Sequence, residues 1–397
     1  MQDGTNPPIP GTVVELDVTN VANGGACIAR YDGQVVFVRH ALPGERVLAE
    51  ITEVSKKFLR ANTTEVLIPS PHRVAAPCQY AGICGGCDWQ HASLEYQREL
   101  KSVVVREQLA HLGGVTEVND MPLAEFHVRA LTPNESGLRW RTRNRFARLG
   151  DMGVGLKMAR SHAVVEIDDC LIAVPDAVAL AEQALHVGQG DIQTAQSATG
   201  QHVVVDPRGG PWLDEQVGDR HWRIHASAFW QVHNDAPEVF VQTVREMAGL
   251  KPGESVLDLF AGSGLFAACI AQDVGESGTV VAVESAINAV RDARRSCSDI
   301  PQMELITADA GLWLNDCSET FDVVILDPPR AGAGSDAISR IAQIAQRSII
   351  YVACEPSALG RDTGYLQELG WSLTNLVGLD AFPMTSHVEC IAKFVKA

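Results

Sequence analysis

The chain has 397 residues, which is too many for one ordinary hydrophobic core and predicts two or three domains. Nearly half of the residues are apolar, but no apolar run approaches the roughly 18 to 20 residues that span a bilayer. We therefore expect a cytoplasmic protein without a membrane or secretory segment. The net charge of −17 disfavours RNA as a partner, so an RNA site on this chain has to be a local basic region of an acidic body.

Residues 1–68 are predicted to form a small β-barrel. Short runs rich in Val, Ile and Thr alternate there with glycine-containing turns. The clearest runs are Val13–Leu16, Gln34–Arg39, Arg46–Val54 and Thr64–Ile68. About five short strands in a segment of this length are typical of the OB type, a common platform for single-stranded nucleic acid. A small basic cluster, Lys56, Lys57 and Arg60, lies in the same segment.

A proline-containing linker, Pro69-Ser70-Pro71, separates this barrel from a group of cysteines. Cys78, Cys84 and Cys87 lie within ten residues. In a long cytosolic chain, clustered thiols indicate metal ligands or catalytic groups rather than disulfides, and this spacing suits zinc as well as iron. A helix is predicted next, over residues 93–112, and a Gly-Gly pair ends it.

Residues 130–235 are predicted to be mixed β structure with one helix over Ala177–Leu185. The stretch 139–160 is strongly basic, and Asp151 is the acidic residue within it. Its cations are Arg139, Arg141, Arg143, Arg145, Arg148, Lys157 and Arg160. Such a strip either contacts RNA or is a charged, solvated strand, and the sequence leaves both interpretations open.

From residue 235 the pattern changes to alternating strands and helices. The predicted buried strands are Val256–Phe260, Thr279–Val283, Phe321–Leu326 and Ser348–Val352. The predicted helices between them are Leu265–Ala271, Ala286–Arg295 and Ala337–Gln346. This alternation predicts a parallel, doubly wound α/β sheet, which binds ligands at the carboxyl edge of its strands.

A cofactor pocket is predicted at the end of the first of these strands. The chain turns there through Phe260, Gly262 and Gly264 into a helix, and glycines in such a turn let a ligand approach the backbone. Glu284 ends the next strand, where a carboxylate can accept hydrogen bonds from both ribose hydroxyls of an adenosine cofactor. Asp309 follows the third strand and is expected to meet the adenine. Because a third, phosphate-binding glycine is missing, the pattern favours S-adenosylmethionine over a dinucleotide.

Two reactive groups are predicted at the same sheet edge. Asp327 begins an Asp-Pro-Pro-Arg motif after one strand, and the prolines stiffen the loop that presents its carboxylate. Cys354 follows the next strand. A thiolate is suited to add to carbon 6 of uracil, which makes carbon 5 nucleophilic, and to leave again. The Asp-Pro-Pro motif alone also suits methylation of an exocyclic amine, but those enzymes have an aromatic residue where this chain has Arg330.

The base that removes the carbon 5 proton is predicted near the C-terminus. His387 and Glu389 share one face of a strand, because side chains alternate with a period of two. Glu389 is the predicted base, since a positioned carboxylate can accept a proton from carbon. His387 is either a hydrogen-bonding support for this site or a surface residue.

Together these residues resemble the uracil-5-methyltransferase family of RNA enzymes, specifically its iron–sulfur members that act on large-subunit ribosomal RNA. The resemblance covers nearly the whole chain. The Leu-Pro-Gly-Glu stretch that ends at Glu45 is similar to the end of a TRAM domain, an RNA-binding barrel. The cysteine segment that starts at Cys78 is similar to the family's cluster motif, and a distant fourth cysteine completes it. The resemblance implies a 4Fe–4S cluster held by Cys78, Cys84, Cys87 and Cys170.

The resemblance also implies roles in catalysis and a domain order. Phe229-Trp230-Gln231 is similar to the family's F-x-Q motif, whose glutamine contacts the cofactor, so Gln231 is expected to do this. Cys354 and Glu389 match the family's nucleophile and base, and Asp327 is expected between cofactor and uracil. The implied domains are a TRAM barrel over 1–68, a central mixed α/β iron–sulfur and RNA-recognition domain over 69–234, and a Rossmann-like class I methyltransferase domain over 235–397.

Two positions depart from the family's pattern. Glu355 replaces the usual asparagine after the nucleophile, and its negative charge is expected to raise the pKa of the neighbouring thiol. Leu265 stands where many members have a polar asparagine near the cofactor. Neither change removes a reacting group.

The sequence therefore predicts a monomeric enzyme that uses S-adenosylmethionine to methylate carbon 5 of a specific uridine in RNA. Ribosomal RNA is favoured and transfer RNA is the alternative. Two further hypotheses are an RNA-binding protein of this fold that has lost catalysis and a methyltransferase that acts on an amine. The presence of both Cys354 and Glu389 argues against a lost activity.

Overall fold

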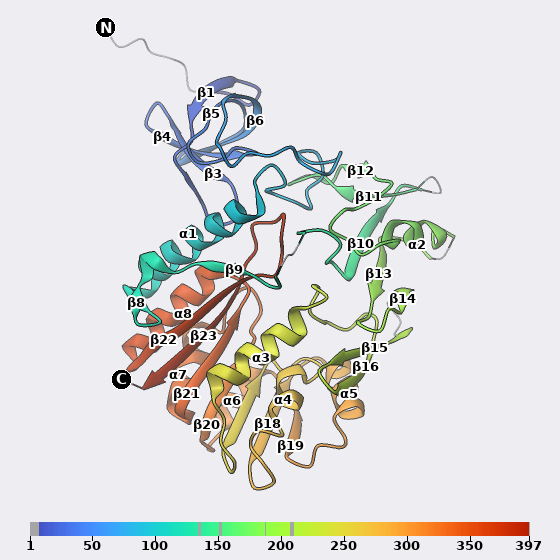
Figure 1. Cartoon of the computed structure of the whole chain (residues 1–397), viewed down its shortest axis with the longest axis vertical. Helices are drawn as coiled ribbons and strands as arrows, with labels where there is room; N and C mark the ends of the chain where they lie inside the picture. Colours follow the sequence, from blue (N-terminus) through green and yellow to red (C-terminus); the bar gives the residue numbers. More distant parts are fainter. Residues whose placement is uncertain (1–7, 134–135, 151–152, 187, 207–209, 397) are drawn as a thin grey trace. The chain divides into compact units, whose positions relative to one another are not determined.

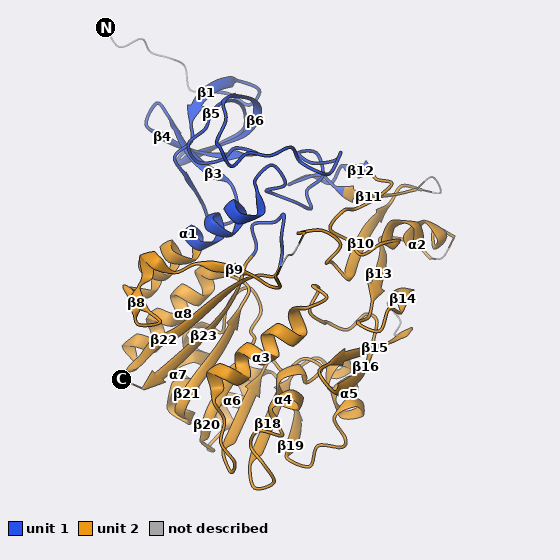
Figure 2. Cartoon of the chain, in the orientation of Figure 1, with its two compact units in different colours: residues 1–104, 157–165, 382–387 blue, residues 105–156, 166–381, 388–397 orange. Residues whose placement is uncertain are grey.

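The computed structural model describes residues 8–133, 136–150, 153–186, 188–206 and 210–396. The chain divides into two compact units, shown in different colours in Figure 2. The first unit comprises residues 1–104, 157–165 and 382–387, and the second comprises residues 105–156, 166–381 and 388–397. Within the described ranges, no helix is long and apolar enough to cross a membrane.

The first unit contains a six-stranded sheet made from the N-terminal residues (Figure 1), with the strand order β1-β5-β6-β4-β3-β2. Its strands are β1 (Val13–Asp17), β2 (Asn20–Val21), β3 (Cys27–Tyr31), β4 (Gln34–Arg39), β5 (Arg46–Val54) and β6 (Phe58–Ile68). Every second side chain faces inward, so Leu16 of β1 and Val36 of β4 belong to one apolar core. The predicted strands are present, and β6 begins at Phe58 rather than Thr64.

Two later segments of the chain join the first unit through its cysteine-bearing stretch. The backbone N–H of Gly85 donates to the carbonyl of Lys157, and that of Asp88 donates to the carbonyl of Met384, each at 3.0 Å. Helix α1 (Leu94–Gly113) begins in this unit and continues into the second. The predicted helix is thus confirmed to within one residue at each end.

The second unit is organised around an eight-stranded sheet with the order β19-β18-β17-β20-β21-β23-β22-β9. Its strands are β9 (Val128–Ala130), β17 (Ser255–Leu259), β18 (Thr279–Glu284), β19 (Met303–Thr307), β20 (Phe321–Leu326), β21 (Ala345–Ala353), β22 (Trp371–Asp380) and β23 (Glu389–Lys396). Strands β17 to β21 run parallel to their neighbours in that group, as predicted. Strand β23 pairs antiparallel with both β21 and β22, so the sheet is mixed and not wholly parallel.

Helices cover both faces of this sheet (Figure 1), with α6, α7 and α8 on one face and α3, α4 and α5 on the other. The helices are α3 (Ala236–Ala248), α4 (Leu265–Ile270), α5 (Ile287–Ser296), α6 (Ala310–Asp316), α7 (Gly334–Ile344) and α8 (Pro356–Glu368). Leu257 and Leu259 of β17 pack into the core on the α6–α8 side. Asp258 points to the opposite face, because side chains alternate along a strand.

Smaller elements lie between α1 and α3. They are β7 (Glu117–Val118), β8 (Met121–Pro122), the 3-10 helix η1 (Leu123–Glu125), β10 (Arg143–Arg148), β11 (Val154–Lys157), β12 (Val164–Glu166), α2 (Ala177–Gln183), β13 (Ile192–Gln196), β14 (His202–Val204), β15 (Trp212–Val217) and β16 (Arg220–His225). Strand β10 pairs with β11 and β13, and β13 pairs with β14. The hairpin of β15 and β16 packs on α5.

Candidate active site

The strand register brings the ends of three neighbouring strands to one edge of the large sheet. Leu259 of β17 pairs with Leu326 of β20, and Leu326 pairs with Tyr351 of β21. Asp327 follows Leu326 directly, and its backbone N–H donates to the carbonyl of Leu259 (3.3 Å). The Asp-Pro-Pro-Arg loop and the phenylalanine–glycine turn after β17 therefore leave the sheet side by side, at the carboxyl edge where such folds bind ligands.

The same register places Cys354 opposite Glu389. Ala353, the last residue of β21, pairs antiparallel with Cys390 of β23. One step along both strands in opposite directions leads to Cys354 on one side and Glu389 on the other. Glu389 is 3% exposed and Cys354 is half-buried. The predicted nucleophile and the predicted base thus lie at one end of one strand pair, next to the strand that ends before Asp327.

The electrostatic surroundings of Cys354 favour the neutral thiol. Burial raises the pKa of Cys354 to about 12, with further increases from the charges of Glu389 and Asp327. Arg330 is the cation that opposes these effects. In the free protein at neutral pH the sulfur therefore carries its proton, and a thiolate forms only when that proton is transferred to another group.

Two carboxyl groups of this site are themselves easily protonated. Burial raises the pKa of Asp327 to about 7. Burial, and then the charge of Asp327, raise the pKa of Glu389 well above its usual value, while Arg330 lowers it. Two interacting carboxyl groups with raised pKa values can hold and exchange a proton near neutral pH, which is the property that acid–base chemistry needs.

Glu355 was expected to raise the pKa of Cys354, but other carboxyl groups do so in the structure. The carboxyl groups that raise the pKa of Cys354 are Glu389 and Asp327, and not the neighbour in sequence. Glu355 is the N-cap residue of α8, where its side chain accepts hydrogen bonds from the backbone N–H and the hydroxyl of Ser357 (3.5 and 3.0 Å). This carboxylate is thus engaged by the first turn of the helix, which stabilises negative charge there.

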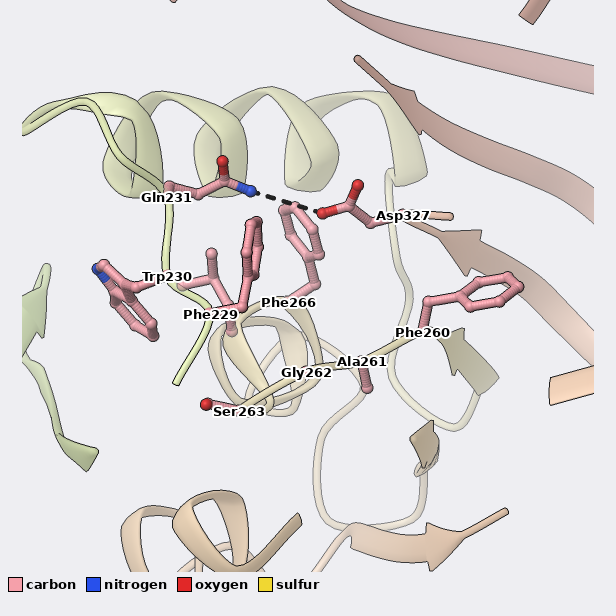
Figure 3. A pocket seen from close by; sticks show the side chains of 10 residues that line it. Phe229, Trp230, Gln231, Phe260, Ala261, Gly262, Ser263, Phe266 and Asp327 are labelled. Atoms are coloured by element: carbon pink, nitrogen blue, oxygen red, sulfur yellow. Dashed lines mark hydrogen bonds between the residues drawn. The ribbon is translucent and has the colours of Figure 1, made fainter. Parts of the chain in front are cut away.

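A pocket lies beside these groups on the β17 side (Figure 3). Its lining comes from the segment before α3, from the turn after β17 and from Asp327: Phe229, Trp230, Gln231, Phe260, Ala261, Gly262, Ser263, Leu265, Phe266 and Asp327. The side-chain amide of Gln231 donates to the carboxylate of Asp327 (3.5 Å), as the dashed line in Figure 3 marks. Three of the predicted cofactor residues, Gln231, Phe260 and Gly262, therefore line one pocket together with Asp327.

The turn after β17 has an unusual backbone. Phe260, Gly262 and Gly264 have φ values of 61°, 56° and 79°, in the left-handed region that glycine tolerates and phenylalanine does not favour. A Cβ at Gly264 would come within 3.2 Å of the terminal methyl group of Met303, a tight contact that the flexible methionine would have to relieve, so the positive φ is the main reason for glycine here. Strain of this kind at Phe260 is typical of a loop that a ligand site requires.

Glu284 holds this turn from the neighbouring strand. One carboxylate oxygen accepts from the backbone N–H of Gly262 (2.9 Å) and the other from that of Ala286 (2.6 Å). Asp309, the other predicted carboxylate, does not contact this turn in the same way. It is exposed, and its carboxylate caps α6 by accepting from the N–H of Leu312 (3.0 Å). Asp309 is not among the residues that line the pocket.

The four predicted cluster cysteines are all half-buried. Cys78, Cys84 and Cys87 lie in the first unit, whereas Cys170 belongs to the second. The N–H of Gly86 donates to the sulfur of Cys84 (3.3 Å). Among the residues that the structure describes, no three or more His, Cys, Asp or Glu side chains form a group that could hold a metal ion. The chemistry of the four thiols suits a metal, and the cluster stays a prediction.

The predicted basic strip is engaged within the protein for most of its length. Its arginines in the second unit bind acidic partners or backbone carbonyls, through the ion pairs Arg139–Asp169, Arg143–Glu215 (2.9 Å) and Arg145–Asp191 (3.1 Å) and the bonds from Arg148 to carbonyl oxygens of Leu185 and Gly190. These arginines therefore hold together the sheet that contains β10, β11, β13 and β14 and the segments next to it. Whether this part of the strip also contacts RNA stays a prediction.

Three protein families match parts of the chain. Residues 9–64 match the TRAM domain, residues 228–314 match protein-L-isoaspartate(D-aspartate) O-methyltransferase, and residues 310–396 match tRNA (uracil-5-)-methyltransferase. The last of these contains Asp327, Cys354 and Glu389. The second covers the strands and turns around the predicted cofactor pocket.

Relatives match along the whole chain. An uncharacterized RNA methyltransferase of Streptomyces coelicolor is 40% identical, and the match covers 96% of this chain and 92% of the relative. One from Streptomyces avermitilis is 38% identical (96% and 98% covered), and one from Bdellovibrio bacteriovorus is 34% identical (99% and 97% covered). The chain belongs to this RNA methyltransferase family.

The methyltransferase also shares its fold with a solved structure. The tRNA (uracil-54, C5)-methyltransferase of Pyrococcus abyssi, crystallised with S-adenosyl-L-homocysteine, matches with a TM-score of 0.73 and 23% identity over 96% of this chain and 99% of that chain. The predicted fold class, an S-adenosylmethionine-dependent methyltransferase fold with an N-terminal β-rich TRAM domain, is thus confirmed. The iron–sulfur nature of the central part stays a prediction.

Some residues of the site were not predicted from the sequence. Asp258 is fully buried, and burial raises its pKa to about 8. One oxygen accepts from the N–H of Ala267 (2.9 Å), and the other has no hydrogen-bond partner within the described residues. Its signal was a single charged residue inside an apolar strand. Arg330 was noted only as a departure from amine methyltransferases, although it is the cation that acts on both Cys354 and Glu389. His387 lies in the first unit, edge-on to Phe382, and its role stays a prediction.

Proposed function

We propose that the methyltransferase transfers a methyl group from S-adenosylmethionine to carbon 5 of a uridine in RNA, through a covalent bond between Cys354 and carbon 6. The observation that carries this proposal is the register that sets Cys354 opposite Glu389, with Asp327 at the end of the adjacent strand. A thiol, a buried carboxyl base and a second carboxyl group at one sheet edge are the groups that this chemistry requires.

The first step is the addition of sulfur to the base. The proton of Cys354 leaves as its sulfur bonds to carbon 6, and the carbon 5–carbon 6 double-bond electrons move to carbon 5 and the adjacent carbonyl. Because the pKa of the free thiol is about 12, this proton has to pass to a nearby group, and ionised Asp327 can accept it, which leaves Glu389 ionised for the later step. Arg330 is the cation available to stabilise the sulfur while it carries charge.

The remaining steps end with release of the product. When bound, S-adenosylmethionine supplies an electrophilic methyl group that carbon 5 attacks, and its sulfur keeps the electrons of the broken bond. Glu389, in its ionised form, then takes the proton from carbon 5. The electrons of that carbon–hydrogen bond reform the ring double bond, and the bond between carbon 6 and Cys354 breaks.

The pocket of Figure 3 is the proposed cofactor site. Glu284 is the proposed acceptor for the ribose hydroxyls, and Gln231 is proposed to contact the cofactor while it holds Asp327. Gly262 has a left-handed backbone conformation and no side chain, so the cofactor can approach the backbone of this turn closely. Asp309, exposed after β19, stays a proposal for the adenine end.

A trap for the covalent bond tests the proposal. RNA transcribed with 5-fluorouridine presents carbon 5 without a removable proton, so the bond to Cys354 cannot be broken after methyl transfer. We expect a protein–RNA band on a denaturing gel that needs S-adenosylmethionine and disappears in Cys354→Ala. Cys317→Ala is a matched control on a half-buried thiol outside the site. Full methyl transfer by Cys354→Ala would overturn the covalent route and favour an amine acceptor.

The RNA partner is proposed from the TRAM domain and a cluster of cations in the first unit. The pKa of Arg160 is lowered by partial burial and then by the charges of Arg60 and Arg39, so three guanidinium groups lie close together. Arg60 also lies over the rings of Phe37 and Phe58 (5.6 and 4.9 Å to the ring centres). Clustered cations beside aromatic rings are a typical surface for single-stranded nucleic acid.

Ribosomal RNA is the first candidate for the substrate, and transfer RNA is the second. The ribosomal candidate rests on the resemblance of the cysteine segment, and the transfer RNA candidate is supported by the family that matches residues 310–396. The deciding experiment is to map 5-methyluridine in both RNAs from cells with and without the gene. Loss of one position in ribosomal RNA is the expected result, and loss only in transfer RNA would select the alternative.

A 4Fe–4S cluster on Cys78, Cys84, Cys87 and Cys170 is also proposed, as a structural element and not as a participant in the reaction. In support, all four cysteine side chains are half-buried, and the backbone N–H of Gly86 donates to the sulfur of Cys84. Protein purified without oxygen should contain iron and acid-labile sulfide in equal amounts, and Cys170→Ser should lose both. Zinc without sulfide would refute the cluster.

A further inference from the structure

The loop of residues 382–387 ends just before Glu389 in the chain, and it is held by an unusual set of hydrogen bonds within the first unit. Its backbone, and not only its side chains, is bound. The N–H of Met384 donates to the side-chain oxygen of Gln97 (2.8 Å), and the carbonyl of Phe382 accepts from the ammonium group of Lys101 (3.0 Å). Both partners are on the first turns of α1.

Gln97 and Lys101 are fully buried side chains. A buried amide or ammonium group is costly unless hydrogen bonds compensate for the water it loses, and lysine is among the residues least often buried. The side-chain amide nitrogen of Gln97 donates to the carbonyls of Trp89 and Ala92 (3.1 and 2.9 Å), and the amide oxygen accepts from the backbone N–H of Met384. One side chain thus joins the cysteine-bearing stretch to the loop.

The cysteine-bearing stretch binds the same loop directly. The backbone N–H groups of Asp88 and Trp89 both donate to the carbonyl of Met384 (3.0 Å each). The carboxylate of Asp88 accepts from the backbone N–H and the hydroxyl of Ser386 (3.2 and 3.1 Å). The loop is therefore bound at Phe382, Met384 and Ser386, at every second residue.

We infer that Gln97 and Lys101 are positioning residues for the base, which fix the backbone that leads into Glu389. This inference rests on the proposed function, because it assigns the two side chains to the step in which Glu389 removes the carbon 5 proton. Neither residue touches the reacting atoms. They act through the loop: when it shifts, the carboxylate that follows it shifts from carbon 5, and proton transfer depends steeply on that distance.

The role makes a distinctive kinetic prediction. Addition of Cys354 and methyl transfer precede the base step, so a displaced base leaves them largely intact and delays only release of the RNA. In Lys101→Met and Gln97→Met we expect methyl transfer within about threefold of the wild-type rate in a single turnover. Release of methylated RNA from the protein should slow about tenfold or more, so that a covalent adduct with ordinary uridine RNA accumulates.

Two reference variants separate the possible outcomes. Glu389→Gln removes the base itself and should accumulate the same adduct, whereas Leu100→Ala loosens the packing of the same stretch of α1 without removing a bond to the loop. If Leu100→Ala accumulates as much adduct as Lys101→Met, the two residues are merely structural and the inference is wrong. If Glu389→Gln forms no adduct, the proposed function itself fails, which is a different result.

A measurement without catalysis checks the same inference. Amide hydrogen exchange of the peptide that contains residues 382–388 reports directly on the bond from Met384 to Gln97. We expect this peptide to exchange at least about tenfold faster in Gln97→Met than in the wild-type protein, with little change in the peptides of β20 and β21. Unchanged exchange in this peptide would overturn the positioning role even where a variant is too unstable for kinetic work.

Discussion

At the scale of single residues, the site combines a thiol that resists ionisation with two carboxyl groups that resist it as well. Cys354, Asp327 and Glu389 all have raised pKa values, and burial is the first cause for each. The proposed chemistry nevertheless needs the thiolate. This arrangement makes sense if the proton moves between these groups only once RNA has closed the site, so that the free enzyme does not expose a reactive sulfur.

Alkylation of Cys354 tests this argument. Because the pKa of its thiol is raised to about 12, the rate of reaction with iodoacetamide should rise about tenfold for each pH unit from 7 to 10, with no plateau. Glu389→Gln removes a charge that raises this pKa, so alkylation at pH 9 should become several-fold faster. Peptide mass spectrometry measures the rate, with Cys317 as the internal reference. A plateau near pH 8 would contradict the assignment.

The candidate residues of the proposed reaction stand out in the sequence because each one borders a recognisable strand. Cys354 and Asp327 follow apolar runs, and Glu389 begins the last such run. What the sequence could not show is which charges surround the thiol. Glu355 is its neighbour in the chain, but the carboxyl groups that raise its pKa come from two other strands. Electrostatics depends on distances in space, and one sequence does not contain them.

At the scale of elements, the loop that begins with Asp327 depends on a buried carboxylate of α8. One oxygen of Asp362 accepts from the hydroxyl of Tyr351 (2.7 Å) and from the backbone N–H groups of Ala333 and Gly334 (2.8 and 3.4 Å). Tyr351 is on β21, the strand that leads to the proposed nucleophile Cys354. The carboxylate of Asp362 therefore joins the end of the Asp-Pro-Pro-Arg loop, strand β21 and helix α8.

Removal of this carboxylate should cost more than removal of one of its partners. In Asp362→Ala, three donors lose their shared acceptor inside the protein, and we expect the free energy of unfolding to fall by about 2 to 4 kcal/mol. Tyr351→Phe removes one donor and should cost about 1 kcal/mol. Urea unfolding of both variants measures the difference. Equal stability of the two variants would show that the loop does not depend on Asp362.

Helices and parallel strands were predicted well because their patterns are local. The predicted helix over 93–112 is α1, and the predicted strand Phe321–Leu326 is β20 as it stands. Strand β9 was missed, since it has only three residues and pairs with Gly378–Asp380 far along the chain. The antiparallel insertion of β23 was missed for the same reason: strand order comes from packing between distant segments, and not from the alternation of apolar residues.

At the scale of the whole molecule, the question is how a chain with a net charge of −17 binds RNA. The cations of the predicted strip divide into two kinds. Those of the second unit are paired with acidic groups, as Arg145 is with Asp191. Arg160, in the first unit, lies near two other arginines, Arg39 and Arg60, which are in turn paired with Asp88 (3.8 Å) and Glu53 (3.0 Å). A local concentration of positive charge on an acidic body can bind RNA at one place while the rest of the surface repels it.

The dependence of RNA binding on salt distinguishes these two kinds of arginine. Each phosphate contact that is lost should reduce the slope of log affinity against log salt concentration by roughly one. We therefore expect Arg160→Ala to weaken binding and flatten this slope, as filter binding between 50 and 300 mM salt (roughly, the range in which phosphate contacts dominate) would measure. Arg145→Ala is the matched control: it is 67% exposed, yet paired with Asp191, so its loss should leave the slope unchanged. An equal effect of the two substitutions would mean that pairing with Asp191 does not keep Arg145 from the RNA, and that RNA contacts both units.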